Sequence, residues 1–157
     1  MKTIQKSLAF ITVVFIMLVT GVFWGTWFTL TRSLDNFSAG EFIHIGQTII
    51  ANVAVPMSVL MPATLLFLLL SMWRSYKTNR TVFWLFTISF VLMVATLIIT
   101  VAVEVPIDNQ IKNWTVDTMP GNWVSLRQTW KEFHMTRTFT SIGSFIFYTL
   151  GVFRRSS

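Results

Sequence analysis

Four long apolar stretches, separated by short polar segments, dominate this sequence. The first, from Ser7 to Leu30, contains no charged residue, and the others lie at about 50–73, 81–103 and 134–153. A helix needs about 20 predominantly apolar residues to cross the hydrocarbon of a bilayer. Backbone polar groups inside a membrane must be hydrogen-bonded internally, so stretches of this length predict transmembrane helices.

Composition supports lipid as the solvent of this chain. The 157 residues are 54% hydrophobic and 11% charged, whereas a soluble domain carries about 25% charged residues. The length predicts a single domain, residues 1–157. The first apolar stretch is longer than the about 7–15 residues of a secretory signal. We therefore interpret it as the first span of a membrane protein.

Basic residues predict how the spans are oriented. Lys2 and Lys6 precede the first span, Arg154 and Arg155 follow the last, and the segment 74–80 connects the middle two. In an all-α, four-helix, up-down-up-down bundle these residues fall on one side, and the positive-inside rule makes that side cytoplasmic. Both termini are then cytoplasmic, and the outer connectors are 31–49 and 104–133. All six acidic residues and both histidines lie toward the outer end.

Short signals predict two of the helix starts. Ser38 and Glu41 have the spacing of a capping box, which predicts a second helix from Ala39 to about residue 73. The fourth helix has two candidate caps, Asn122 and a second capping box that begins at Ser125. Both helices then extend beyond their membrane-crossing parts at the outer end.

The second helix carries one polar stripe. Glu41, His44, Thr48 and Asn52 are spaced 3, 4 and 4 residues apart and share one helical face. Glu-x-x-His is the spacing of the metal-binding pairs in di-metal carboxylate bundles, although those bundles use two such pairs. Capping alone also explains Glu41, and interior hydrogen bonding is the structural alternative for His44.

The third helix ends in two acidic residues. Glu104 directly follows an apolar run and Asp108 lies four residues later, so they share a face if the helix continues through Pro106. A carboxylate at this depth is costly unless it has a partner. The alternative is that the two acids only mark the end of the helix.

The fourth helix carries a second stripe. Trp130, His134, Arg137 and Ser141 are spaced 4, 3 and 4 residues apart. Arg137 precedes an apolar run, so it needs a salt bridge to an acid of the third helix or room to extend to the outer headgroups. Trp130 alone is also explained as an aromatic anchor at the membrane interface.

These residues leave three classes of function open. His44, His134 and Glu104 together form a ligand set suited to iron, copper or zinc. The same groups also suit a metal-free acid–base site. The third alternative is a non-enzymatic bundle that binds a lipid or a partner protein. The chain has no cysteine, which excludes disulfides and thiolate chemistry. Its net charge of +6 does not indicate nucleic acid, because the basic residues flank apolar runs.

Three segments resemble the anthrone oxygenase-like family of small four-span membrane proteins, many of them of unknown function. They are EVPIDNQIKNW (Glu104 to Trp114), WVSLRQTWKEFHMTRT (Trp123 to Thr138) and EFIHIGQTIIANVAVP (Glu41 to Pro56). Family positions are matched by Pro106, Asn109, Trp130, His134 and Arg137. The chain departs from the pattern where Glu104 replaces the more usual asparagine and Asp108 stands beside Asn109.

The resemblance implies a reaction. Fungal members of the family oxidise anthrones to anthraquinones with dioxygen, without flavin or haem. We therefore expect a small membrane oxidoreductase, a monooxygenase that uses no cofactor. Its substrate would be a lipophilic anthrone- or quinol-like phenol in an outward-facing polar cavity. Membrane lipid is the other expected partner, and association into a homo-oligomer stays open.

The candidate residues have distinct expected roles. Either His134 or His44 is the expected general base, because imidazole titrates near neutral pH. Arg137 would stabilise the resulting enolate or phenolate, and Glu104 completes the predicted catalytic set. The expected substrate-binding residues are Asn52, Asp108, Asn109 and Trp130, the last by stacking on the substrate ring.

Overall fold

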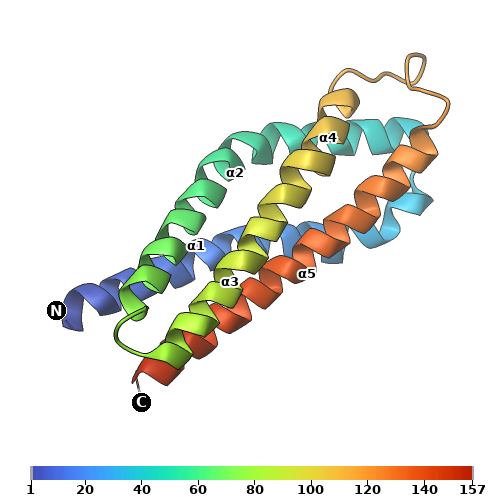
Figure 1. The fold of residues 1–157 in the computed structure, drawn as a ribbon. Coiled ribbons are helices and arrows are strands. Elements are labelled where there is room, and N and C mark those ends of the chain that lie inside the picture. The colour runs from blue at the N-terminus through green and yellow to red at the C-terminus, as the bar shows by residue number, and fades with distance from the viewer. Residues whose placement is uncertain (1, 157) are drawn as a thin grey trace.

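Four long helices run alternately up and down in the computed structural model, and both chain ends lie at the same end of the bundle (Figure 1). They are α1 (Lys2–Thr29), α2 (Ala39–Ser75), α3 (Arg80–Ile99) and α5 (Trp123–Ser156). The structure describes residues 2–156, with the side chains of 4–155, so the side chain of Lys2 lies outside the described part. That part contains no strand. The predicted all-α bundle is confirmed.

A π-helical turn lets the third helix continue through a proline. Between α3 and α4 (Val105–Ile111) lies η2 (Thr100–Glu104), in which the N–H of Val105 bonds to the carbonyl of Thr100. Pro106 has no N–H to donate, and such local widening is how helices absorb a lost bond. Glu104 and Asp108 therefore stay on one continuous helix, which is the condition under which the sequence places them on one face.

The predicted start of α2 is confirmed. The Ser38 N–H donates to Oε2 of Glu41 at 2.8 Å, and the Glu41 N–H donates to Oγ of Ser38 at 3.4 Å, which completes the capping box. The helix contains Pro56 and Pro62, and Figure 1 shows it bending in its outer half. Prolines inside a helix produce such bends because each one removes a backbone hydrogen bond.

The predicted capping box at Ser125 is wrong. Helix α5 begins two residues earlier, at Trp123, so Ser125 is already inside it. The N–H of Leu126 bonds to the carbonyl of Asn122 at 3.2 Å, which puts Asn122, the other candidate, at the cap position. Earlier in the chain, the η1 segment (Thr31–Asn36) joins α1 to α2, and it lies at the same end of the bundle as the start of α5.

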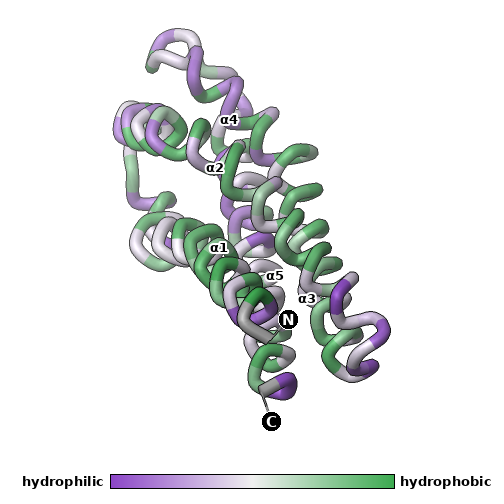
Figure 2. The backbone as a smooth tube through the Cα atoms, turned by 90° about the vertical axis from the view of Figure 1, so that its left-hand side faces the viewer, coloured by the Kyte–Doolittle hydropathy of each residue, from purple (hydrophilic) through white to green (hydrophobic). Residues whose placement is uncertain are grey.

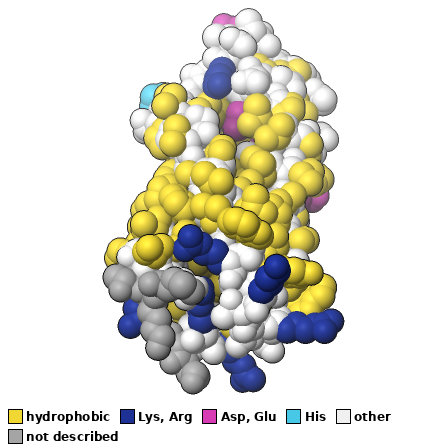
Figure 3. Space-filling view, turned by 60° about the vertical axis from the view of Figure 1, so that its left-hand side comes forward, with side chains coloured by type: hydrophobic (Ala, Val, Ile, Leu, Met, Phe, Trp, Pro, Cys, Tyr) yellow, Lys and Arg dark blue, Asp and Glu magenta, His cyan; other side chains and the backbone are white. Residues whose placement is uncertain are grey.

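Three segments among the described residues are long and apolar enough to cross a membrane. They are Ile4–Asn36, Ala39–Ser75 and Arg80–Ile111. Figure 2 shows the hydrophobic middle parts of α1, α2 and α3, and Figure 3 shows an apolar band with most of the visible Lys and Arg side chains gathered at one end. These features define an integral membrane protein.

Helix α5 is the most polar of the four, and from His134 onward most of its polar side chains point inward. Its buried stripe consists of His134, Arg137, Thr138, Ser141, Ser144 and Tyr148. Its exposed large side chains are Val124, Phe133, Met135, Phe139, Ile146, Leu150 and Phe153. This pattern is the reverse of a soluble amphipathic helix, in which the apolar stripe is buried.

Small and hydroxyl side chains bring α3 and α5 close together. Oγ of Ser89 donates to the carbonyl of Ser144 at 2.8 Å, and Oγ of Ser144 donates to the carbonyl of Ser89 at 2.8 Å. A further hydroxyl pair, Thr96 and Thr140, lies 2.9 Å apart. In lipid, helices associate through such close contacts and interhelical hydrogen bonds.

Gly151 is the tightest point of this contact, and Gly151→Ala should destabilise the protein by about 1–3 kcal/mol. A Cβ there would lie 2.5 Å from the ring of Phe86, which is itself stacked on Tyr148 with ring centroids 4.6 Å apart and therefore has no room to move. Thermal unfolding in a mild detergent measures the effect. Gly21→Ala is the matched control, since its Cβ meets nothing within 4 Å. Equal midpoints for the two variants would contradict this contact.

Two apolar clusters fill the bundle, one in each half. The inner cluster joins the four long helices and consists of Ile16, Val19, Phe23, Met61, Leu68, Val82, Phe86, Met93 and Tyr148. The outer cluster joins η1, α2, α4 and α5 and consists of Leu34, Phe42, Ile43, Ile50, Ile107, Ile111, Trp114 and Trp130. The charged residues described next lie between these two clusters.

Candidate functional site

A buried ion pair links η2 to α5. Nη2 of Arg137 lies 2.9 Å from Oε2 of Glu104, and the two residues are 8% and 0% exposed. The predicted salt bridge of Arg137 is therefore made with Glu104. In the described part of the chain neither carboxylate oxygen of Glu104 receives a well-directed hydrogen bond. Arg137 is thus the main counter-charge that keeps this carboxylate stable in the interior.

His134 is held through both ring nitrogens. Nδ1 accepts hydrogen bonds from Nε and Nη2 of Arg137 at 3.2 and 2.8 Å, and Nε2 lies 3.3 Å from the carbonyl oxygen of Phe23. A nitrogen that accepts from a guanidinium carries no proton, and a nitrogen that faces a carbonyl must donate one. These partners assign His134 as a neutral imidazole protonated at Nε2.

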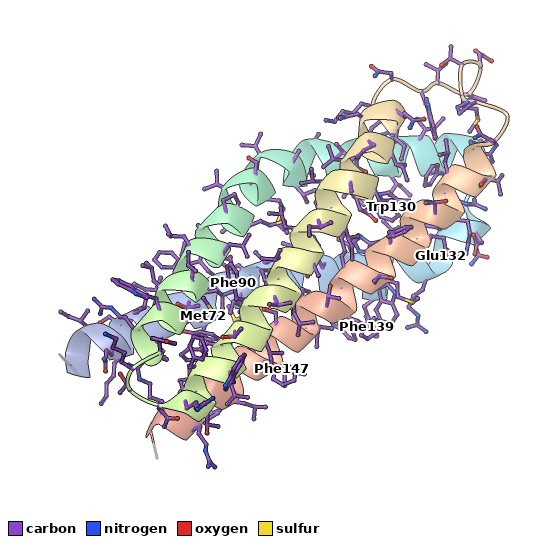
Figure 4. The ribbon with its side chains drawn as sticks, in the orientation of Figure 1. Met72, Phe90, Trp130, Glu132, Phe139 and Phe147 are labelled. Atoms are coloured by element: carbon purple, nitrogen blue, oxygen red, sulfur yellow. The ribbon has the colours of Figure 1, made fainter. Side chains whose placement is uncertain are left out.

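Trp130 connects His134 to Asp108. Its indole stacks on the His134 ring with centroids 4.8 Å apart and an interplanar angle of 12°, and its Nε1–H donates to Oδ1 of Asp108 at 3.0 Å. In Figure 4 Trp130 lies on the side of α5 that faces α4, whereas Glu132 points away from it. At 8% exposure Trp130 is a buried partner in this network, in place of the interface anchor considered from sequence.

A cavity of about 460 Å³ lies beside this network. Its polar wall consists of Thr100, Asp108, Asn109, Lys112, Trp130, His134 and Arg137. Apart from Thr26 and Ser58, the remaining lining is apolar and includes Phe23, Leu30, Phe42, Ile49, Val53, Met57 and Met61. The sequence predicted a polar cavity, whereas this one is mostly apolar with polar groups gathered on one wall. Such a lining suits a lipophilic ligand that carries a polar group on one side.

The stripe of the second helix does not reach the cavity. His44 and Asn52 are exposed and do not line it, and Glu41 is used by the capping box. A histidine is visible on the surface in Figure 3. Glu104 and His134 are therefore not joined by His44, and no three His, Asp or Glu residues of the described chain gather as a metal site would require.

The other candidates keep their places at the site. Asn109 lines the cavity at an exposed position and accepts a hydrogen bond from Nζ of Lys112 at 3.1 Å. Glu104 stands behind Arg137 and does not line the cavity. The polar network is thus built from α1, η2, α4 and α5, while α2 contributes only apolar and small residues to the cavity wall. The sequence left open whether the polar stripes of the second, third and fourth helices meet; those of the third and fourth do, and that of the second does not.

Two residues of this site have no signal in the sequence. Phe23 lies in an apolar run, yet its carbonyl binds His134 and its ring lies 4.7 Å from the Arg137 guanidinium carbon. Thr100 accepts a hydrogen bond from Nη1 of Arg137 at 3.4 Å. Both contacts depend on how helices pack against each other, which helical spacing alone does not predict.

The sequence pattern also gave no role to Arg127, which the structure buries to 9% exposure. Its Nη1 donates to the carbonyl of Leu34 at 3.1 Å, its Nη2 lies 3.3 Å from Oδ1 of Asp35, and its guanidinium carbon lies 4.9 Å from the Trp123 ring centroid. Asp35 also pairs with Lys131. Arg127 thereby fastens η1 to α5 beside the outer cluster.

The fold and the site together define a small helical integral membrane protein with a buried charged network beside an apolar cavity. The chain belongs to the anthrone oxygenase family, because the model of that family, described as anthrone oxygenase, matches residues 47–147. That range covers part of α2, all of α3, η2 and α4, and most of α5. No curated protein and no solved structure matches the chain.

Proposed function

We propose that this protein is a small membrane oxygenase that uses dioxygen to oxidise a lipophilic phenolic substrate, anthrone- or quinol-like, bound in the cavity. The observation that carries the proposal is the mainly apolar cavity with Arg137 and Asp108 on one wall. An apolar ring system would occupy the larger part of this space. Its acidic oxygen or C–H group would face the charged wall.

The orientation in the membrane is part of this proposal. Helix α5 is the fourth span, which is supported by its buried polar stripe and its exposed apolar face. Both termini are cytoplasmic, which is supported by the gathering of basic side chains at their end of the bundle (Figure 3). The cavity then lies in the outer half of the membrane, with membrane lipid around it.

Arg137 is the proposed electrostatic catalyst. It lines the cavity, and its guanidinium is fixed by Glu104, by Nδ1 of His134 and by Thr100. A positive charge that is held in place before reaction stabilises a developing enolate or phenolate without reorganising. His134 acts on Arg137 as a positioning residue, because its two ring nitrogens are already engaged.

Asp108 is the proposed general base. Its carboxylate lines the cavity and is oriented by the indole N–H of Trp130. The assignment moves the base from His134, whose nitrogens hold other partners, and from His44, which lies outside the cavity. Proton removal by a positioned carboxylate gives the enolate that dioxygen attacks.

For an anthrone the overall reaction balances without a further reductant, while a quinol would give two electrons and two protons to O₂ and leave a quinone and H₂O₂. The base removes a C–H proton, and the carbanion carbon transfers its electron pair to dioxygen, forming a C–O bond and a hydroperoxide. Loss of water from that hydroperoxide breaks the O–O bond and the second C–H bond and leaves a ketone. One methylene and one O₂ thus give one carbonyl and one H₂O, so the substrate supplies all four electrons. The proposed chemistry therefore uses no cofactor.

Oxygen uptake tests the proposal. Protein in lipid vesicles is supplied with an anthrone or a quinol, and oxygen consumption is followed beside protein-free vesicles. We expect uptake well above autoxidation, and with ¹⁸O₂ one labelled oxygen in the anthraquinone formed from an anthrone. Uptake no faster than in protein-free vesicles across a panel of anthrones and quinols would overturn the proposed reaction.

His44→Ala separates this proposal from the metal alternative. Because His44 is exposed and does not line the cavity, we expect the oxygen uptake rate to stay within about twofold of the unmodified protein, as for surface changes away from a site. A metal held by His44, His134 and Glu104 would instead lose a ligand. Elemental analysis of both proteins, purified without chelator, is the second readout. Lost uptake together with lost metal would favour the metal site.

A further inference from the structure

Two exposed stripes border the cavity on neighbouring helices. On α2 the lining residues Ala54, Ser58 and Pro62 are exposed, and they are spaced four residues apart. On the α3–η2–α4 helix, Val101, Val105 and Asn109 are exposed lining residues with the same spacing, and Lys112 follows them. A residue that lies both on the cavity wall and on the outer surface marks the edge of an opening.

The two stripes face each other at the same depth. The Gln47 side chain donates to the carbonyls of Ile111 and Trp114 at 3.1 and 3.0 Å, which fixes the register of α2 against α4. The helices are antiparallel (Figure 1), and both rise about 1.5 Å per residue. Counting inward from Gln47 and Ile111 places Ser58 opposite Val101, within the apolar runs.

The opening narrows toward its outer end, where Asn109 and Lys112 form its edge. There Gln47 bonds across to the end of α4, and Gly46 lets α2 approach, since a Cβ on it would lie 3.1 Å from Ile111. The outer apolar cluster, which includes Phe42 and Trp114, covers the same end of the bundle. Packed side chains therefore cover this end of the bundle, and Asn109 and Lys112 form the polar edge of the opening.

The inner end of the opening is closed. Below Pro62, the inner cluster joins α2 to α3 through Leu68, Phe86 and Met93. Figure 4 shows Met72 and Phe90 on these two helices in the inner half, where both pack against that cluster. The proline-bent section of α2 thus borders a window that is closed at its inner end and narrows to a polar edge at its outer end.

We infer that the cavity takes its ligand sideways from the bilayer, through the window between Ala54–Pro62 on α2 and Val101–Val105 on the facing helix. This inference rests on the proposed function and narrows its substrate class. The ligand reaches the site as a neutral, lipid-dissolved aromatic, and forms that carry a permanent charge are excluded. This lateral window takes the place of the outward-facing opening expected from the sequence.

Thiol reactivity tests the route without any turnover. The chain has no cysteine, so Val53→Cys places a unique thiol on the cavity wall. In vesicles, a neutral lipid-soluble organomercury chloride should react with it: sulfur bonds mercury, chloride leaves the mercury, and the thiol proton leaves with it as HCl. A sulfonated, membrane-impermeant organomercurial should react at least about tenfold more slowly, since a permanent charge is costly to move through hydrocarbon.

Blocking the window should slow the neutral reagent. Added to Val53→Cys, Ser58→Trp fills one edge of the window, and we expect the reaction to slow by about tenfold or more, since a ring of this size fills a gap between helices. Val59→Trp is the matched control, because Val59 is the next residue, is 64% exposed and does not line the cavity. If Ser58→Trp lowers the unfolding midpoint, Val101→Phe blocks the opposite edge.

Three results would overturn the inference. They are equal rates for the charged and neutral reagents, an unchanged rate after either edge is filled, and no reaction with the neutral reagent. Because the readout is thiol modification, a missing oxygenase activity leaves these outcomes readable. A blocked window with intact oxygen uptake would count against this route while leaving the proposed reaction in place.

Discussion

Asp108→Asn is expected to remove most of the oxygen uptake while the protein stays folded. The amide keeps the shape of the side chain, and its oxygen still accepts the Trp130 N–H that now bonds to Oδ1 at 3.0 Å. What it loses is the ability to take a proton from the substrate. A positioned general base contributes about 10²–10⁴-fold to a rate, so the rate in the vesicle assay should fall by about that factor.

Asp117→Asn is the control for this change. Asp117 is exposed in the connector between α4 and α5 and does not line the cavity, so the same chemical replacement should leave the rate unchanged. Equal unfolding midpoints for the two variants would establish that the Asp108 effect is chemical. If Asp108→Asn kept half of the wild-type rate and His134→Ala abolished it, the base would be His134 instead.

Much of the fold was predictable because it depends on local rules. Apolar runs of about 20 residues predict spans, and the Ser38–Glu41 spacing predicted where α2 begins, which the structure confirms. The pairing of Arg137 with Glu104 was also within reach, since a charge beside an apolar run requires a partner at the same depth. In each case the prediction depended on one helix alone or on the free-energy cost of burying one charge.

The second helix shows what helical spacing leaves open. Spacing correctly places His44, Thr48 and Asn52 on one face, yet that face is exposed and the opposite one, with Ile49 and Val53, lines the cavity. Which face turns inward is decided by the neighbouring helices. A polar stripe near the outer end of a span can face water as well as a cavity, so its polarity did not settle the question.

The fourth helix shows the reverse case. Its Ser and Thr residues make it less apolar than the other spans, and it is absent from the three segments that qualify by composition. The structure explains this Ser and Thr content, because Ser141 and Ser144 are fully buried and Thr140 bonds to Thr96 on α3. The roles of Phe23 and Thr100 were out of reach for the same reason, because they exist only once helices are packed.

Removing the charge of Arg137 alone should have the largest effect on stability. In Arg137→Gln the carboxylate of Glu104, which is fully buried, loses the guanidinium that lies 2.9 Å away. Breaking a buried ion pair from one side costs about 3–5 kcal/mol, because the remaining charge is left without compensation. We expect a correspondingly lower midpoint of thermal unfolding in mild detergent. The same variant should also lose oxygen uptake.

Glu104→Gln combined with Arg137→Gln separates the structural role of the pair from its chemical role. With both charges gone no uncompensated ion remains, so the double variant should recover most of the stability that Arg137→Gln loses, and the double-mutant cycle should show that the two changes are not additive. Oxygen uptake should not return, because the positive charge that stabilises the enolate is still missing. If both the stability and the oxygen uptake recovered, the role of Arg137 would be limited to pairing with Glu104. A single Arg137→Gln variant as stable as the unmodified protein would show that this ion pair does not hold η2 against α5.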